Sequence, residues 1–129
     1  MTNTTDERAV SQARSQLDTI CELVAVYRSV NEKGDDDSGA LQQIYQNGLA
    51  VSVRSNWQEP GSRFEPSEYQ VLLCWGGPSC RIIGDLAGGD PVTARLEYQD
   101  WFTPWEELQI SATETETLID FARFFYFGN

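Results

Sequence analysis

Residues 69–99, YQVLLCWGGPSCRIIGDLAGGDPVTARLEYQ, decide the fold of this 129-residue chain. Two apolar runs, residues 69–75 and 80–86, flank the turn sequence Gly76-Gly77-Pro78. After a second glycine-rich turn, residues 92–99 alternate apolar and polar side chains. A period of two is typical of a half-buried strand, and short turns join antiparallel neighbours. The segment therefore predicts three consecutive antiparallel strands.

A fourth strand is predicted on the N-terminal side, where Leu49, Val51 and Val53 alternate with small or polar residues. Between this strand and residue 69 the chain holds two prolines and a glycine, so residues 55–67 are expected to form a loop. Loops of this length in compact domains often carry function.

Helices are predicted on both sides of the strands. Apolar residues recur in steps of three and four over residues 6–31, which is typical of an amphipathic helix. A short helix is expected at residues 40–47 and a final one at residues 113–126. The order of elements predicts an α+β domain: an antiparallel four-stranded meander with the three helices packed on one face.

The chain is expected to be a single domain over residues 1–129, with residues 1–5 disordered. Its N-terminal residues are polar and acidic, without the apolar core of a signal peptide. No apolar run approaches the roughly 20 residues that span a bilayer. We expect a cytoplasmic protein of a bacterial host cell that does not bind membranes.

The formal net charge is -11, from twenty acidic and nine basic residues. This charge opposes direct binding to nucleic acid. Three explanations stay open: a solvated acidic surface, the surface of a halophilic protein, or acids that imitate phosphates toward a basic partner.

The chain has no histidine and three cysteines, Cys21, Cys74 and Cys80. This composition excludes imidazole as a catalytic base and zinc sites that need histidine. Gly76-Gly77-Pro78 lacks the lysine and the following helix of a phosphate-binding loop, and no calcium-loop pattern surrounds Asp35, Asp36 and Asp37. The sequence predicts no catalytic, metal or cofactor site and no enzyme.

The candidate residues for partner binding are acids in loops and at helix ends, together with aromatic residues around Pro104. Asp35, Asp36 and Asp37 form a solvated run, and Trp101, Phe102 and Trp105 form either an exposed ridge or part of the core. The full candidate set is Asp35, Asp36, Asp37, Trp101, Phe102, Trp105, Glu106, Glu107, Glu114 and Glu116.

Three segments carry a resemblance: LLCWGGPSCRIIGDL at residues 72–86, ARLEYQDWFTPW at residues 94–105 and TLIDFARFFYFG at residues 117–128. Over residues 41–128 the chain resembles small acidic proteins encoded on bacterial phages, prophages and plasmids. The resemblance brings no catalytic residues with it. It implies that the chain is encoded on elements that also carry proteins blocking host restriction or CRISPR complexes, some of which imitate DNA. The chain itself carries no motif of the well-known antirestriction proteins.

The first hypothesis is therefore a non-enzymatic acidic binding protein of a mobile element. It would inhibit a host defence complex, of the anti-CRISPR or antirestriction type, by occupying a basic nucleic-acid-binding surface of a host protein or ribonucleoprotein. The alternative is an interaction protein without nucleic-acid mimicry, such as a homodimer joined through the aromatic C-terminal region.

Overall fold

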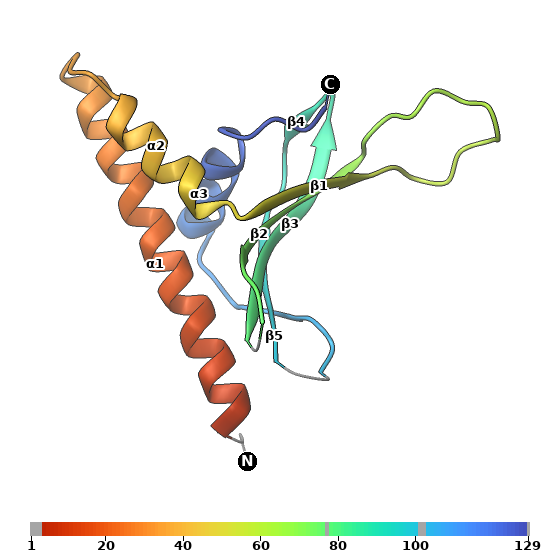
Figure 1. The fold of residues 1–129 in the computed structure, drawn as a ribbon, viewed down its shortest axis with the longest axis horizontal. Coiled ribbons are helices and arrows are strands. Elements are labelled where there is room, and N and C mark those ends of the chain that lie inside the picture. The colour runs from red at the N-terminus through yellow and green to blue at the C-terminus, as the bar shows by residue number, and fades with distance from the viewer. Residues whose placement is uncertain (1–3, 77, 101–102, 129) are drawn as a thin grey trace.

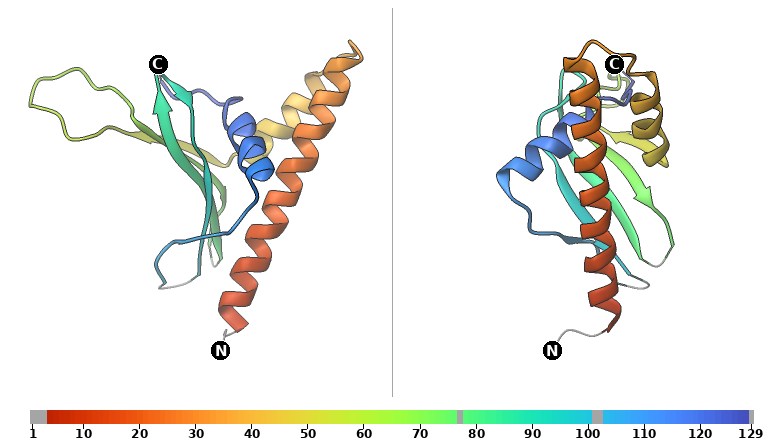
Figure 2. Two further views of the ribbon diagram at one scale, coloured as in Figure 1. Left: turned by 180° about the vertical axis from the view of Figure 1, so that it is seen from behind. Right: turned by 90° about the vertical axis from the view of Figure 1, so that its left-hand side faces the viewer.

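Figure 1 shows the computed structural model, which describes residues 4–76, 78–100 and 103–128. The helices are α1 (Thr4–Glu32), α2 (Ser38–Asn47) and α3 (Ala112–Ala122). Figures 1 and 2 show all three on the same face of one antiparallel sheet. The predicted α+β class and the three helices on one face are thus confirmed.

The sheet has six strands in place of the predicted four. In sheet order they run β1-β2-β3-β5-β6, and β4 pairs with β3 beside this path. Every pairing is antiparallel. The strands are β1 (Ala50–Arg54), β2 (Glu68–Cys74), β3 (Ser79–Ala87), β4 (Asp90–Pro91), β5 (Arg95–Gln99) and β6 (Glu106–Glu107).

One of the two extra strands, β4, lies in the predicted second glycine-rich turn, and the strand predicted at residues 92–99 begins only at Arg95. The pairing of β3 shifts by one residue between β4 and β5, which leaves Thr93 as an additional residue. The carbonyl of Thr93 turns toward β2 and accepts a 2.8 Å hydrogen bond from the hydroxyl of Tyr69. Any residue with a Cβ atom at position 84 would collide with the carbonyl of Thr93. Because Gly84 has no Cβ, the bulge can lie close to β3.

The core lies between the helices and one face of the sheet. Tyr69, Val71 and Leu73 alternate along β2 and point toward the helices, while α1 contributes a stripe in steps of three and four. The buried residues of this stripe are Ala9, Ala13, Leu17, Ile20 and Val24. At about 25 cal/mol per Å² of apolar surface, this shared core is the main stabilising term.

Helix α3 begins with a capping box, in which Ser111 accepts a hydrogen bond from the N–H of Glu114 and Glu114 accepts one from the N–H of Ser111. The helix ends at Ala122, four residues before the predicted end. Beyond it the chain turns, so that the ring of Phe127 lies 5.0 Å from that of Tyr69. Packing of this buried ring on β2 overrides the local helical periodicity.

Two parts of the molecule lie outside the packed core: one face of the sheet and one long loop. The other face of the sheet is not covered by helices in either view (Figures 1 and 2). Residues 55–67, which join β1 to β2, form a long loop that projects away from the sheet and from the helices. We call residues 55–67 the arm. The sequence predicted this loop, and the structure shows how far it projects.

Candidate functional site

The acids on α1 occupy the face turned away from the core. Glu7, Asp18, Glu22 and Glu32 are all exposed, whereas the core stripe of the same helix is buried. Residues 7 to 32 extend over roughly 38 Å at 1.5 Å per residue. The solvent-exposed surface of α1 thus carries acids along its length, interspersed with the exposed Arg8 and Arg28.

Asp35, Asp36 and Asp37 lie in the loop between α1 and α2, as expected. Asp35 and Asp36 are exposed and Asp37 is half-buried. The N–H of Ser38 donates a 3.0 Å hydrogen bond to Asp36, and this bond holds the pKa of the carboxyl below its usual range. Acids at the C-terminal end of a helix face the negative end of its dipole, so their position does not serve the stability of α1.

The other predicted acids separate into structural and exposed groups. Glu114 closes the capping box of α3, and Arg14 of α1 donates to it at 2.9 Å. The N–H of Ser111 lowers the pKa of Glu114, and Arg14 adds to the effect. Glu116 is exposed on α3, away from this pair. Glu114 thus joins two helices in addition to contributing surface charge.

Glu106 and Glu107 form the edge strand β6, and both are exposed. The hydroxyl of Tyr98 donates a 3.0 Å hydrogen bond to Glu106, and Glu107 pairs in register with Glu97 of β5. The predicted acids therefore do not gather at one site: they lie at the α1–α2 loop, on β6 and at the start of α3.

Trp105 is half-buried and packs on the open face of the sheet. The guanidinium carbon of Arg81 lies 4.1 Å from its ring centroid, which is within the range of a cation–π contact. Trp101 and Phe102 lie outside the described residues. Trp105 thus covers the open sheet face while one side stays in contact with solvent, and it is not one of the core residues beneath α3.

An ordered polar network surrounds Arg81 on this open face. Its guanidinium donates to Glu97 at 2.7 and 2.9 Å and to Gln70 at 2.7 Å, and Arg95 donates to Glu97 at 3.1 Å. Burial raises the pKa of Glu97, but the hydrogen bonds and charges of Arg81 and Arg95 outweigh it and hold the pKa below its ordinary value. Next to this network is a pocket of about 110 Å³ between β1, β2 and β3.

Cys74 and Cys80 face each other across the β2–β3 pair as free thiols. A hydrogen bond from Cys80 lowers the pKa of the Cys74 thiol to about 7, and the same bond raises the pKa of Cys80. The contact accounts for a more acidic thiol at Cys74. It does not supply the separate base that nucleophilic catalysis requires.

Among the described residues, no three His, Cys, Asp or Glu side chains are grouped so that they could hold a metal ion. None of the described helices has the length and apolar character needed to cross a membrane.

Comparison with protein-family models, with curated proteins and with solved structures found no match to this chain. The functional argument therefore depends on the geometry of the molecule itself.

The arm carries aromatic residues that the sequence-based candidates omitted. Trp57 is fully exposed, at 103% of its reference area, and Phe64 is 56% exposed. Large apolar side chains held in solvent are typical of interaction surfaces. The length of the loop was the available signal, but its aromatic residues could equally have folded back onto the sheet.

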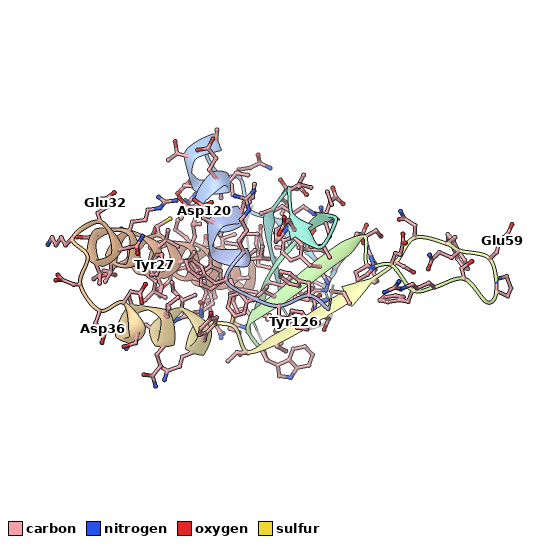
Figure 3. All side chains as sticks on the ribbon, turned by 90° about the horizontal axis from the view of Figure 1, so that it is seen from above. Tyr27, Glu32, Asp36, Glu59, Asp120 and Tyr126 are labelled. Atoms are coloured by element: carbon pink, nitrogen blue, oxygen red, sulfur yellow. The ribbon has the colours of Figure 1, made fainter. Side chains whose placement is uncertain are left out.

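Figure 3 shows that the acidic loop and the arm lie at opposite ends of the molecule. Glu32 and Asp36 are at one end and Glu59, in the arm, is at the other. The chain thus presents two separate candidate surfaces: the acidic face of α1 with its adjoining loop, and the arm with the strand that leads into it.

Proposed function

We propose that this chain is a non-enzymatic acidic binding protein that occupies a basic nucleic-acid-binding surface of a host protein or ribonucleoprotein. In the setting suggested by its resemblance to proteins of mobile elements, it would inhibit a host defence complex of the anti-CRISPR or antirestriction type. The acidic face of α1, continued by the Asp35, Asp36 and Asp37 loop, would be the contact.

The observation that carries this proposal is the position of the acids relative to α1. Glu32 and the three aspartates lie within six residues at the α1–α2 turn, with Lys33 as the one basic residue among them. Asp36 and Asp37 also directly precede α2, where the positive end of the helix dipole favours acids. A basic partner would neutralise the exposed charges of this turn on binding.

The density of acids along α1 decides what kind of contact the helix could make with a basic partner. Duplex DNA carries one negative charge per 1.7 Å of its axis, which is far denser than four acids over roughly 38 Å of α1. The proposal therefore depends on electrostatic complementarity with a basic groove and not on a phosphate-by-phosphate copy of a duplex. Long-range attraction would raise the association rate, and apolar contacts would slow dissociation.

The proposal can be tested in cells that express a restriction or CRISPR system. Expression of the chain should raise the plating efficiency of a targeted phage, and replacement of both Asp18→Lys and Glu22→Lys should abolish this protection. The matched control, Asp90→Lys with Glu59→Lys, makes the same charge change at two exposed acids away from α1 and should retain it.

Salt dependence of binding provides the physical test. With a purified defence complex that captures the chain, affinity should fall steeply between about 50 and 500 mM NaCl, because screening removes the attraction between exposed charges. Binding that is insensitive to salt over this range would contradict the charge-based contact.

A further inference from the structure

The side of the molecule formed by α2, β1 and the first limb of the arm is almost free of charge. Residues 38–58 include a single charged side chain, Arg54, in a chain of net charge -11. Arg54 is itself paired with Glu68 of the neighbouring strand. We call residues 38–58 the neutral edge. Since copies of an acidic protein repel each other, this edge is where two copies can approach at the least electrostatic cost.

The backbone of the neutral edge is open to another strand. β1 is the terminal strand of the sheet, and alternate residues of such a strand direct their N–H and C=O groups away from the sheet. Proteins usually protect an edge with lysine, proline, a bulge or a covering element. β1 has the sequence AVSVR, without proline or lysine. Beside its outer edge Leu49 is 59% exposed and Val51 is 38% exposed.

We propose that two copies of the chain pair through β1, antiparallel and centred on Ser52, to form one continuous sheet across a two-fold axis. Ser52 is the middle residue of the five-residue strand, so this register pairs its whole length. It places Val51 of each copy opposite Val53 of the other. Cross-strand pairs of β-branched residues are favourable in antiparallel sheets.

The same symmetry brings the arm of each copy to α2 of the other. In an antiparallel pair, the residues that follow Ser52 in one copy lie beside those that precede it in the other. Trp57 is about 17 Å beyond Ser52 at 3.3 Å per residue. It therefore reaches the C-terminal turn of the second copy's α2. Figure 3 shows α2, β1 and the arm following one another along one side of the molecule, as this arrangement requires.

The outer face of α2 offers a place for the Trp57 ring. Tyr45 on this face is 50% exposed. The shallow surface around it carries no charge and is formed by Ser38, Leu41, Gln42, Tyr45 and Gln46. An indole beside Tyr45 would remove two exposed aromatic surfaces from water at once. Of the C-terminal aromatics, Phe121 and Phe127 are buried within the chain, whereas Tyr126 is 74% exposed.

Sedimentation of the full chain tests the proposal. Across about 1 to 500 μM protein, the chain should pass from monomer to dimer by mass action. Leu49→Glu and Trp57→Ala should each weaken the dimer roughly tenfold or more, since the first places a charge beside the paired strands and the second removes the aromatic contact with α2 of the other copy. Val26→Glu and Trp75→Ala change exposed residues of the same types outside the neutral edge and should leave the dimer unchanged.

A cross-link tests the register. Ser52→Cys places two thiols directly opposite each other, at the Cα separation of 4.5 to 5.5 Å that both antiparallel pairs and disulfides accept. Mild oxidation should give a covalent dimer of this variant. Ser15→Cys, exposed on α1, is the control and should stay monomeric on a denaturing gel.

A chain that stays monomeric at every concentration would overturn the proposal. So would a dimer that Leu49→Glu and Val26→Glu weaken equally. Failure here is distinguishable from failure of the proposed function, because the two associations respond oppositely to salt. Salt screens the repulsion between copies and should strengthen the dimer, whereas it should weaken binding to a basic partner.

Discussion

Cys74 and Cys80 illustrate how a single contact changes the chemistry of a residue. Because Cys80 donates a hydrogen bond that favours the Cys74 thiolate, the pKa of Cys74 is lowered to about 7, while burial raises the pKa of Cys21. Iodoacetamide should therefore modify Cys74 half-maximally near pH 7, and before Cys21, as measured by mass spectrometry of the peptides. Cys80→Ala removes the donor and should move the midpoint toward the ordinary value of about 8.5. Earlier labelling of Cys21 would contradict this assignment.

Glu97 is the residue on which the network of the open sheet face depends. Glu97→Gln would leave Arg81 and Arg95, which both donate to this carboxylate, without a charged acceptor. We expect a loss of about 2 kcal/mol in the free energy of unfolding at pH 7. Urea denaturation measures it, and Glu65→Gln, at an exposed acid of the arm, is the control expected to be close to neutral.

The pH dependence of the same variant follows from the direction of the pKa shift. A carboxyl whose pKa is lowered by folding stabilises the protein above its unfolded pKa, near 4.3 for glutamate, and loses this contribution as the pH falls through the folded pKa. The difference between the wild-type chain and Glu97→Gln should therefore shrink as the pH falls below about 4. An equal difference at pH 7 and pH 3 would show that packing, and not charge, accounts for it.

At the scale of elements, the arm should be separable from the fold. Ser67 donates its N–H to the carbonyl of Arg54, so the β1–β2 pair already closes at the base of the arm. Replacing residues 56–66 by Asn-Gly would leave Ser55 opposite Ser67 across a two-residue hairpin turn. The shorter loop should raise the free energy of unfolding by about 1 kcal/mol. Circular dichroism and urea denaturation measure this outcome.

The shortened variant also separates the roles of the arm and the sheet. It should lose most of the dimerisation expected for the wild-type chain, because Trp57 is removed. If the variant unfolds, the arm takes part in the core of the fold, which its exposure does not indicate.

The sequence was most informative where one element buries a single face. The period of α1 predicted its buried stripe, because burial of one face imposes a repeat on the chain. The alternation at residues 92–99 was a poorer guide, since Leu96 is buried but Val92 is exposed. The bulge at Thr93 and the early end of α3 depend on contacts with Tyr69, which no local pattern reveals. Most acids of the candidate set are exposed, whereas Asp37 and Glu114 are half-buried. The neutral edge was missed because a surface without charge leaves no motif.

At the scale of the whole molecule, the acids are spread over α1, α3 and most of the strands, and α2 has none. Their mutual repulsion opposes the compact state, and added salt screens it. Raising NaCl from about 50 to 500 mM should therefore raise the melting temperature by several degrees. Thermal unfolding followed by circular dichroism measures the shift, at a protein concentration low enough to keep the chain monomeric. A melting temperature that falls with salt would indicate that attractive ion pairs dominate instead.

The pairing of α1 with α3 also affects how the chain reaches its native state. Arg14 and Glu114 are 100 residues apart, and Arg28 and Asp120 are 92 residues apart. On a ribosome that adds 5 to 20 residues per second, α3 is synthesised roughly 5 to 20 s after the residues of α1 that it covers. During that time the apolar stripe of α1 is not covered by α3. Folding of this topology therefore waits for the synthesis of α3, and until then the exposed apolar stripe of nascent α1 is a natural substrate for chaperones.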